Sequence, residues 1–178
     1  MKICIVSSYH LEVTGPLVKR LQEEHEVDFY VPVNNSEKNI FLFGFDATSF
    51  SKTGFLNEEE SARALGTHKE YFNKLKNIFF FLYPDAGYGS PVLYKLFLEL
   101  SFRIRRKKYD VIHVIGQFPL LLTIHLVNYR TPRVHTLHES VPHSGAFPVP
   151  DKTFMKLMSR INAQLIFPSS TTQKRFIE

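Results

Sequence analysis

The polar residues best placed for chemistry follow an apolar run in the second half of the chain. In Arg133–Glu139 (RVHTLHE), His138 and Glu139 stand where the apolar run ends, and His143 follows a few residues later. A histidine at a strand end can donate to a sugar hydroxyl or a phosphate, and a neighbouring carboxylate can fix its tautomer or bind hydroxyls itself. The alternative is that both residues only cap a surface turn. We favour a functional role for His138 and Glu139.

Further polar residues lie inside or directly after similar runs. His113 lies within Tyr109–Ile115 (YDVIHVI), Gln117 follows that run, and Ser169 follows Ala163–Phe167. His113 is either a substrate-binding residue or a core histidine bonded to a backbone carbonyl, and Gln117 either bonds a ligand hydroxyl or faces solvent. Because parallel sheets bind ligands beyond the carboxyl ends of their strands, we expect these residues at one edge of the sheet.

The loop Ser7–Gly15 (SSYHLEVTG) is predicted to join the first strand to a helix opened by Gly15-Pro16. A junction of this kind directs free backbone N–H groups and a partial positive charge at an anion. The loop holds a single glycine rather than a cluster, and Pro16 removes one donor. Gly15 is therefore a candidate for phosphate contact, with a plain tight turn as the alternative.

Other chemistries are not supported by the spacing of the residues. His135, His138, Glu139 and His143 are close in sequence, but HTLHE is not the zinc-binding pattern HExxH. Strand alternation also sends His135 and His138 to opposite faces, so we expect no metal site. No serine lies in a G-x-S-x-G elbow. The single cysteine, Cys4, lies in an apolar strand and is expected to be a core residue.

The elements that must position these residues alternate between short apolar runs and helical segments. This pattern predicts an α/β fold: a Rossmann-like, doubly wound, mainly parallel sheet flanked by helices, in a single domain over residues 1–178. The predicted strands are Lys2–Val6, Val27–Val31, Val111–Ile115, Val134–Leu137 and Gln164–Phe167, and the predicted helices are Gly15–His25, Ser90–Lys108, Pro119–Asn128 and Asp151–Asn162.

The section 32–88 is harder to assign, and we expect it to be a variable excursion from the domain. Ile40–Phe45 is predicted as a strand or a hairpin arm, and Glu58–Leu65 and Thr67–Lys76 as helices. Ile78–Tyr83 (IFFFLY) is an apolar run that is either a strand or the end of a helix.

The charge of the chain bears on its partners. The net charge of +5 favours anionic partners, although an inert basic surface is an equal alternative. The run Arg103–Lys108 (RIRRKK) ends a predicted helix, where cations complement the helix dipole, and the alternative role is peripheral contact with an anionic membrane. No stacking platform interleaves with these cations, so we expect no nucleic acid partner. The single cysteine fits a reducing, cytoplasmic location, and the basic run leaves open a peripheral position at the inner face of the membrane.

Segments along the chain together resemble the N-terminal domain of a GT-B-fold glycosyltransferase of the large family-four type. The resemblance covers both ends of the chain but not residues 32–88, and it rests on the order and spacing of KICIVSSYH, PLVKRLQEEHEV, YDVIHVIGQFPLLL, PRVHTLHESVP and AQLIFPSSTTQKRF. It implies two Rossmann-like domains facing across a cleft, with this one binding the acceptor. A C-terminal domain with an E-x7-E pair, absent from this chain, would hold most of the nucleotide sugar.

The resemblance also implies roles for single residues. His138 matches the family histidine near the transferred sugar, and Glu139 stands where many relatives have aspartate. Gly15 matches the glycine loop near the donor diphosphate, and Tyr9-His10 the acceptor-side loop. His113 matches the histidine of the family's D-V-I-H strand.

The chain departs from the family pattern at one point. Many relatives carry two adjacent glycines in the first loop, where this sequence has Gly15-Pro16, so direct diphosphate contact is in doubt.

The resemblance implies an enzyme that transfers a hexosyl group from a nucleotide-diphosphate sugar to a glycan or lipid-linked acceptor, without a metal or other cofactor. Cell-envelope polysaccharide biosynthesis is the expected setting. We expect the chain to be a truncated protein, inactive alone because catalysis needs a cleft closed around both substrates. Two alternatives remain open: a non-catalytic Rossmann-like ligand-binding or interaction module, and a GT-B-type sugar-nucleotide epimerase.

Overall fold

The computed structural model describes residues 1–7, 11–36, 47–50, 52–65, 75–87, 89–116, 118–137, 157, 160, 161 and 163–167. The elements in chain order are β1 (Lys2–Ser7), α1 (Leu11–Leu21), β2 (Glu26–Asn34), the 3-10 turn η1 (Ala47–Ser49), β3 (Gly54–Phe55), α2 (Glu58–Leu65), β4 (Ile78–Tyr83), α4 (Pro91–Arg106), β5 (Val111–Ile115), the 3-10 turn η3 (Pro119–Leu121), α5 (Leu122–Val127), β6 (Arg133–Thr136) and β7 (Gln164–Ile166).

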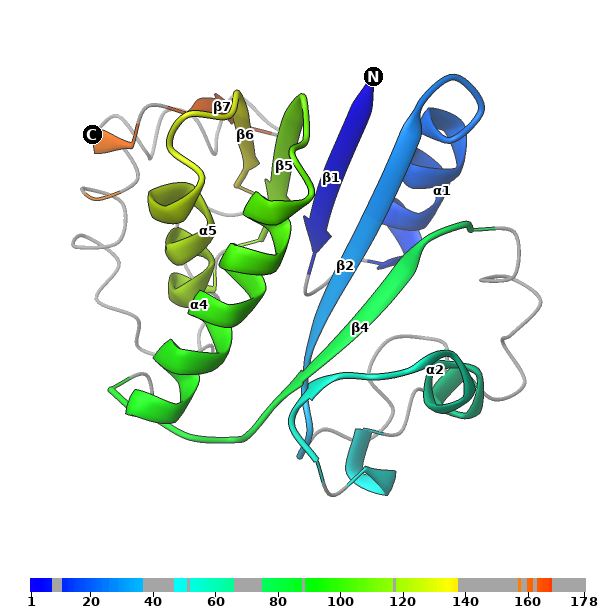
Figure 1. Cartoon of the computed structure of the whole chain (residues 1–178), viewed down its shortest axis with the longest axis vertical. Helices are drawn as coiled ribbons and strands as arrows, with labels where there is room; N and C mark the ends of the chain where they lie inside the picture. Colours follow the sequence, from blue (N-terminus) through cyan, green and yellow to red (C-terminus); the bar gives the residue numbers. More distant parts are fainter. Residues whose placement is uncertain are drawn as a thin grey trace.

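These strands form a seven-stranded sheet in the order β3-β4-β2-β1-β5-β6-β7 (Figure 1). All neighbouring strands are parallel except β3, which runs antiparallel to β4 at one edge. The order places β1 at a point where the chain first winds toward β2 and later returns to add β5 on its other side. The sheet is therefore doubly wound, as the sequence predicts.

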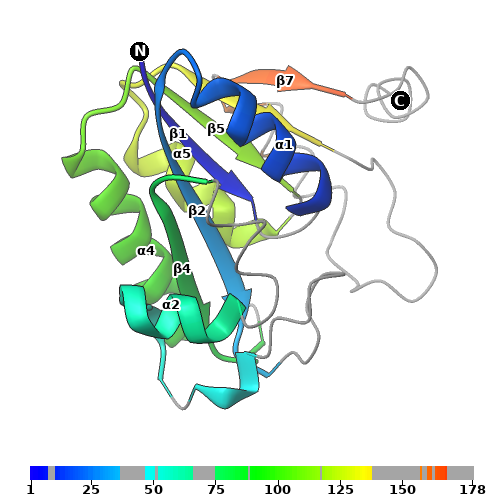
Figure 2. The same ribbon diagram turned by 90° about the vertical axis from the view of Figure 1, so that its right-hand side faces the viewer.

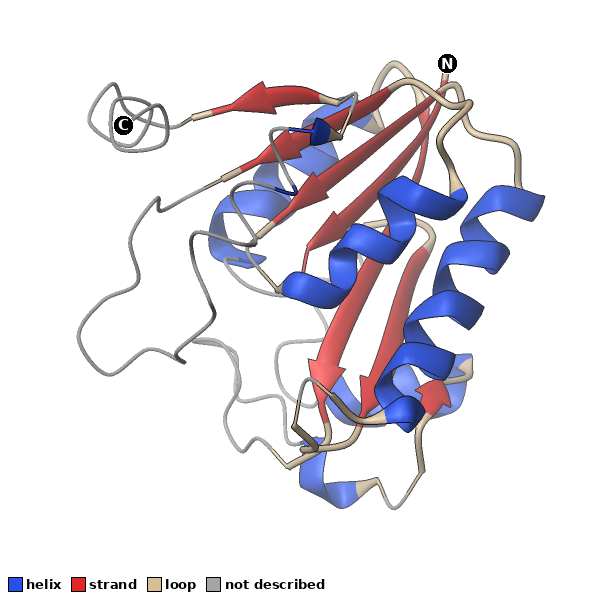
Figure 3. Ribbon diagram, turned by 90° about the vertical axis from the view of Figure 1, so that its left-hand side faces the viewer, coloured by secondary structure: helices blue, strands red, loops and turns tan. Residues whose placement is uncertain are grey.

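Helices cover both faces of the sheet, as Figures 2 and 3 show from opposite sides. Val18 of α1 and Leu65 of α2 pack on one face with Ile5 and Phe29. On the other face, buried residues of α4 and α5 pack with Cys4 and other residues of the central strands. Cys4 is fully buried, as predicted, and its burial raises the pKa of the thiol.

The start of the first helix is a correction to the sequence prediction. Helix α1 begins at Leu11, so Gly15 and Pro16 lie inside the helix rather than at its start. The dipeptide Gly15-Pro16 has the signature of a helix opening, because proline is tolerated best where its missing N–H has no partner. Here the proline removes a single hydrogen bond to the preceding turn instead.

Strand β2 is longer than predicted because it continues through Pro32 to Asn34. The Phe29 N–H donates to the Asn77 carbonyl at the start of β4, so alternate residues of β2 point toward β4 and Pro32 points toward β1. The register pairs Val6 with Tyr30, and β1 ends one residue later at Ser7. Pro32 thus lies beyond β1, where no strand needs its missing N–H.

Part of the section 32–88 belongs to the sheet, and the alternatives left open for Ile78–Tyr83 are decided in favour of a strand. Ile78–Tyr83 is strand β4, which pairs with β2 along six positions and lies between β2 and the edge strand β3. Helix α2 has the predicted bounds Glu58–Leu65. The predicted arm Ile40–Phe45 and most of the predicted helices Thr67–Lys76 and Asp151–Asn162 lie outside the described residues.

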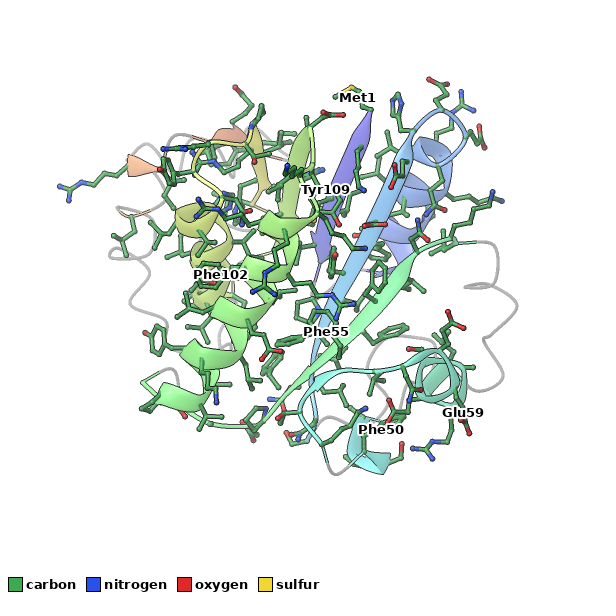
Figure 4. All side chains as sticks on the ribbon, in the orientation of Figure 1. Met1, Phe50, Phe55, Glu59, Phe102 and Tyr109 are labelled. Atoms are coloured by element: carbon green, nitrogen blue, oxygen red, sulfur yellow. The ribbon has the colours of Figure 1, made fainter. Side chains whose placement is uncertain are left out.

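A buried polar network fixes the junction between α4 and β5. The Asp28 carboxylate accepts a hydrogen bond from Lys107 Nζ at 2.8 Å and from the Tyr109 hydroxyl at 2.5 Å. The Tyr109 hydroxyl also lies 2.9 Å from that of Tyr30, and burial raises the pKa of both tyrosines. The network lies near the amino ends of β2 and β5, away from the edge predicted to bind ligands; Figure 4 labels Tyr109 there.

Candidate functional site at the carboxyl edge of the sheet

The carboxyl ends of β1 and β5 define the candidate site. These two strands are neighbours, with Ser7 paired to Ile115, and the chain leaves them in opposite directions: α1 covers one face and α5 the other. Such a switch point leaves a crevice beyond the strand ends, and ligands of doubly wound sheets bind there. The residues that end these strands form the described part of the site.

Ser7 and Thr14 connect the end of β1 to the first part of α1. Both side chains are buried, and their hydroxyl oxygens lie 3.3 Å apart. Gly15 follows Thr14 in the helix and is also buried. Within a helix the N–H of Gly15 is directed at the preceding turn, so it does not offer the free loop donor that the sequence predicted. The contact between Gly15 and a phosphate stays a prediction.

His113 projects from β5 toward the face covered by α1. Its Nε2 lies 2.8 Å from the Thr136 hydroxyl of the neighbouring strand β6, rather than at a backbone carbonyl. Burial lowers the pKa of His113 to about 4, so the imidazole is neutral at pH 7. The structure therefore gives His113 a cross-strand structural bond, and its contact with a substrate stays a prediction.

A buried histidine pair, which the sequence did not predict, fixes the backbone where β5 ends. His135 Nε2 lies 2.7 Å from the Gly116 carbonyl, and His135 Nδ1 lies 2.8 Å from His125 Nε2. Since a carbonyl can only accept, His135 Nε2 carries the proton, and its Nδ1 accepts from His125. Gly116 has φ 127°, a conformation that favours glycine. The pair thus holds the turn that leads out of β5 into the crevice.

Both histidines of the pair are fully buried. Burial lowers the pKa of His125 to about 3 and that of His135 to about 4, so both are neutral at pH 7. The sequence signal was available: each histidine interrupts an apolar run, LLTIHLV for His125 and PRVHTL for His135. What the sequence could not give was the packing of α5 against β6 that brings them together.

The hydrogen bonds of the histidine pair also show whether His135 could bind a metal ion. His135 uses both ring nitrogens in hydrogen bonds within the protein, so neither is available as a ligand in this arrangement. Among the described residues, no cluster of three or more histidine, cysteine, aspartate or glutamate side chains could hold a metal ion.

The remaining predicted site residues lie outside the described residues: Tyr9, His10, Gln117, His138, Glu139, His143 and Ser169. The strand ends that lead to them are described, however. Ser7, Gly116, Leu137 and Phe167 end or follow the successive neighbours β1, β5, β6 and β7. Because all four strands are parallel, the points from which the predicted site residues depart lie along one edge of the sheet.

A cavity of about 610 Å³ lies elsewhere, between α2 and the beginning of β4. Its lining includes Glu58 and Ser61 of α2, Ile78 and Phe79 of β4, and Arg103 of α4. It opens at the amino end of β4, so it is separate from the carboxyl edge and carries none of the predicted site residues.

No helix in the described ranges is both long enough and apolar enough to span a membrane.

A doubly wound, mainly parallel sheet flanked by helices defines a Rossmann-like domain, here matching the N-terminal half of a GT-B fold. The chain belongs to Glycosyltransferase Family 4, whose family model matches residues 15–178. Both results confirm the resemblance drawn from the sequence.

Solved structures support the fold. The chain is similar to a UDP-N-acetylglucosamine 2-epimerase from Rickettsia bellii (TM-score 0.58, 12% identity) and to one described as putative from Listeria monocytogenes (TM-score 0.57, 11% identity), covering 99% of this chain and 41% of each of theirs. A UDP-GlcNAc 2-epimerase from Neisseria meningitidis, bound to UDP-GlcNAc, matches with a TM-score of 0.55 and 13% identity over 99% of this chain and 43% of that one. The chain therefore spans about two fifths of these structures. No curated protein matches it by sequence.

Proposed function

We propose that this chain is the acceptor-side domain of a glycosyltransferase that transfers a hexosyl group from a nucleotide-diphosphate sugar to a glycan or lipid-linked acceptor. The observation that carries the proposal is the family match over residues 15–178. The similarity in fold to an enzyme bound to UDP-GlcNAc supports a nucleotide sugar as the donor. The reaction belongs to the complete protein, in which a second domain would hold most of the donor.

His138 and Glu139 are the proposed catalytic residues, with His138 donating a hydrogen bond near the transferred sugar and Glu139 fixing its orientation. Tyr9, His10, His113, Gln117, His143 and Ser169 are the proposed substrate-binding residues, and Gly15 is the proposed contact for the diphosphate. Stabilisation of the departing diphosphate would come from fixed dipoles and cations, largely of the second domain, and we propose that no metal is needed.

We also propose a cytoplasmic location and a role in cell-envelope polysaccharide synthesis. Nucleotide sugars are charged, water-soluble donors, so the enzyme must face the compartment that holds them. Labelling of the cell-envelope glycan in a strain that lacks the complete protein would test this setting; an unchanged glycan would contradict it.

The reaction can be tested with the complete protein and a panel of nucleotide sugars, each with and without candidate acceptors. We expect release of nucleoside diphosphate only when an acceptor is present, together with a product larger by one sugar. Inversion at C2 of the sugar without any acceptor would identify an epimerase instead, the class of the similar solved structures. Binding of a nucleotide sugar without turnover under any condition would favour the non-catalytic module.

A further inference from the structure

The outer face of helices α4 and α5 carries large apolar side chains that stay exposed. Tyr94, Leu98 and Phe102 recur every four residues along α4, so they form one stripe, and Phe102, labelled in Figure 4, is 47% exposed. Leu126 of α5 is 65% exposed, and Tyr129 in the turn after it 55%. Because α4 and α5 pack side by side on the same face of the sheet, these residues belong to one surface, here called the α4/α5 face (Figure 1).

Cations border this apolar stripe. Lys95, Arg105 and Arg106 of α4 are exposed beside it, and Arg130 follows α5. Glu99 is the only acidic residue in α4, and α5 has none; both helices are described in full. The α4/α5 face therefore combines apolar side chains with an excess of positive charge.

The cations of Arg103–Lys108, predicted from the sequence to act as one basic patch, fall into two groups in the structure. The Arg103 guanidinium stacks on the Phe55 ring at 3.9 Å, and Lys107 is held by buried Asp28. Neither faces outward with the stripe. Arg105 and Arg106 remain exposed and extend the α4/α5 face to the end of the helix.

The charge decides between the surfaces that could cover such a face. A second copy of the chain would bring two positively charged faces together, which is unfavourable. An apolar stripe bordered by lysine and arginine instead matches a lipid surface, where the apolar groups enter the headgroup region and the cations meet lipid phosphates. Exposed apolar patches rimmed by polar residues are typical of such contact sites.

We propose that the α4/α5 face binds the surface of a bilayer that contains anionic phospholipid. Leu98 and Phe102 insert into the headgroup region, and Lys95 and Arg106 contact the phosphates. Helix α4 begins just after the carboxyl end of β4, so the bound face lies beside the candidate site rather than across it. The proposal does not depend on the proposed reaction, because it concerns only the binding of the α4/α5 face to a bilayer.

Flotation of the chain with vesicles tests the proposal, using phosphatidylcholine alone or with about 30% phosphatidylglycerol, at about 0.05 M and about 0.5 M salt. We expect binding to the anionic vesicles that weakens strongly at high salt. Lys95→Gln with Arg106→Gln should weaken binding at low salt by about 25-fold, since each removed cation near the surface costs about fivefold. Leu98→Ser with Phe102→Ser should weaken it by about tenfold or more.

Leu17→Ser with Lys19→Gln is the matched control, because it removes one exposed apolar residue and one cation from α1, on the other face of the sheet. The control should bind like the unmodified chain, and circular dichroism should show that every variant is folded. The proposal is wrong if the chain does not bind anionic vesicles at low salt, or if both α4 variants bind as the control does. Concentration-dependent dimerisation that the Leu98→Ser, Phe102→Ser variant abolishes would show that a second copy covers this face.

Discussion

His125 and His135 couple the protonation of two buried side chains to the backbone at the end of β5. Their pKa values, about 3 and about 4, lie below the ordinary value of 6.5, and the pKa of His113 is lowered to about 4 as well. Each imidazole is therefore neutral in the folded chain under conditions in which the unfolded chain binds a proton. Acid must then favour the unfolded state.

The lowered pKa values predict that the free energy of unfolding falls as the pH falls. Above pH 6.5 the histidines are neutral in both states and the contribution of each to stability is fully present. As the pH falls from about 6.5 toward about 4, the free energy of unfolding should drop by up to about 1.4 kcal/mol per pH unit for each histidine. Urea unfolding at several values between pH 7 and pH 5 measures the slope, in a range where most carboxylates stay ionised.

The variant His135→Gln should unfold at lower urea concentration at pH 7 but should lose stability less steeply with acid. A matched control is His25→Gln, because His25 lies in the turn before β2, outside the hydrogen-bonded pair. An equal pH slope in the wild type and in His135→Gln would show that the buried pair does not titrate on unfolding.

His138 is the residue whose proposed role in the reaction is tested most directly. In the complete protein, His138→Ala should lower kcat by about 100-fold or more, because one oriented donor to charge that develops in the transition state is worth that much. Nucleotide release and circular dichroism would be measured together, since the fold should not change. His25→Ala at the opposite end of the sheet should turn over normally. Wild-type turnover by His138→Ala would remove His138 from the site.

Helix α4 is the element whose position depends most on a single polar network. Its C-terminal end is tied to the sheet where Lys107 and Tyr109 meet Asp28, which is only 2% exposed. Removing the Tyr109 hydroxyl would leave the buried carboxylate without its closest donor, and the loss of a hydrogen bond to a buried charged group costs about 1.5–3 kcal/mol.

We therefore expect Tyr109→Phe to lower the free energy of unfolding by about 2 kcal/mol, measured by urea unfolding at pH 7. Tyr94→Phe makes the same chemical change on the exposed face of α4 and should alter stability by less than about 0.5 kcal/mol. If both variants lose the same stability, the network does not anchor the helix.

The elements also show what the sequence could and could not predict. The strands Val111–Ile115 and Gln164–Ile166 were predictable because short runs of valine, isoleucine and leucine between helical segments leave few alternatives. The start of α1 was not, because Gly15-Pro16 carries a local signal for a helix opening that Leu11–Thr14 overrides. Pro32 signals a strand end by itself, and only the length of the neighbouring strand β1 explains why β2 continues.

The candidate site was predictable as a place more than as a set of contacts. Parallel topology alone puts the ends of β1, β5, β6 and β7 on one edge, so the edge follows from the strand pattern. The bond between His113 and Thr136 depends instead on the register of β5 against β6, which residue spacing does not encode. The same holds for His125 and His135, which meet only through tertiary packing.

For the whole molecule, the proposed division of work between two domains predicts how nucleotides act on stability. The chain spans about two fifths of the similar solved structures. The proposal assigns most of the contacts with the donor to a second domain of the complete protein. A ligand at a hundred times its Kd stabilises a protein by about 2.7 kcal/mol, so UDP should raise the Tm of the complete protein by several degrees. The 178-residue chain alone should show no measurable rise at the same UDP concentration.

Thermal unfolding of both proteins with UDP, and with inorganic phosphate as the control anion, measures the difference. An equal rise in both would mean that the donor binds chiefly to this domain, beside the crevice where β1 and β5 end.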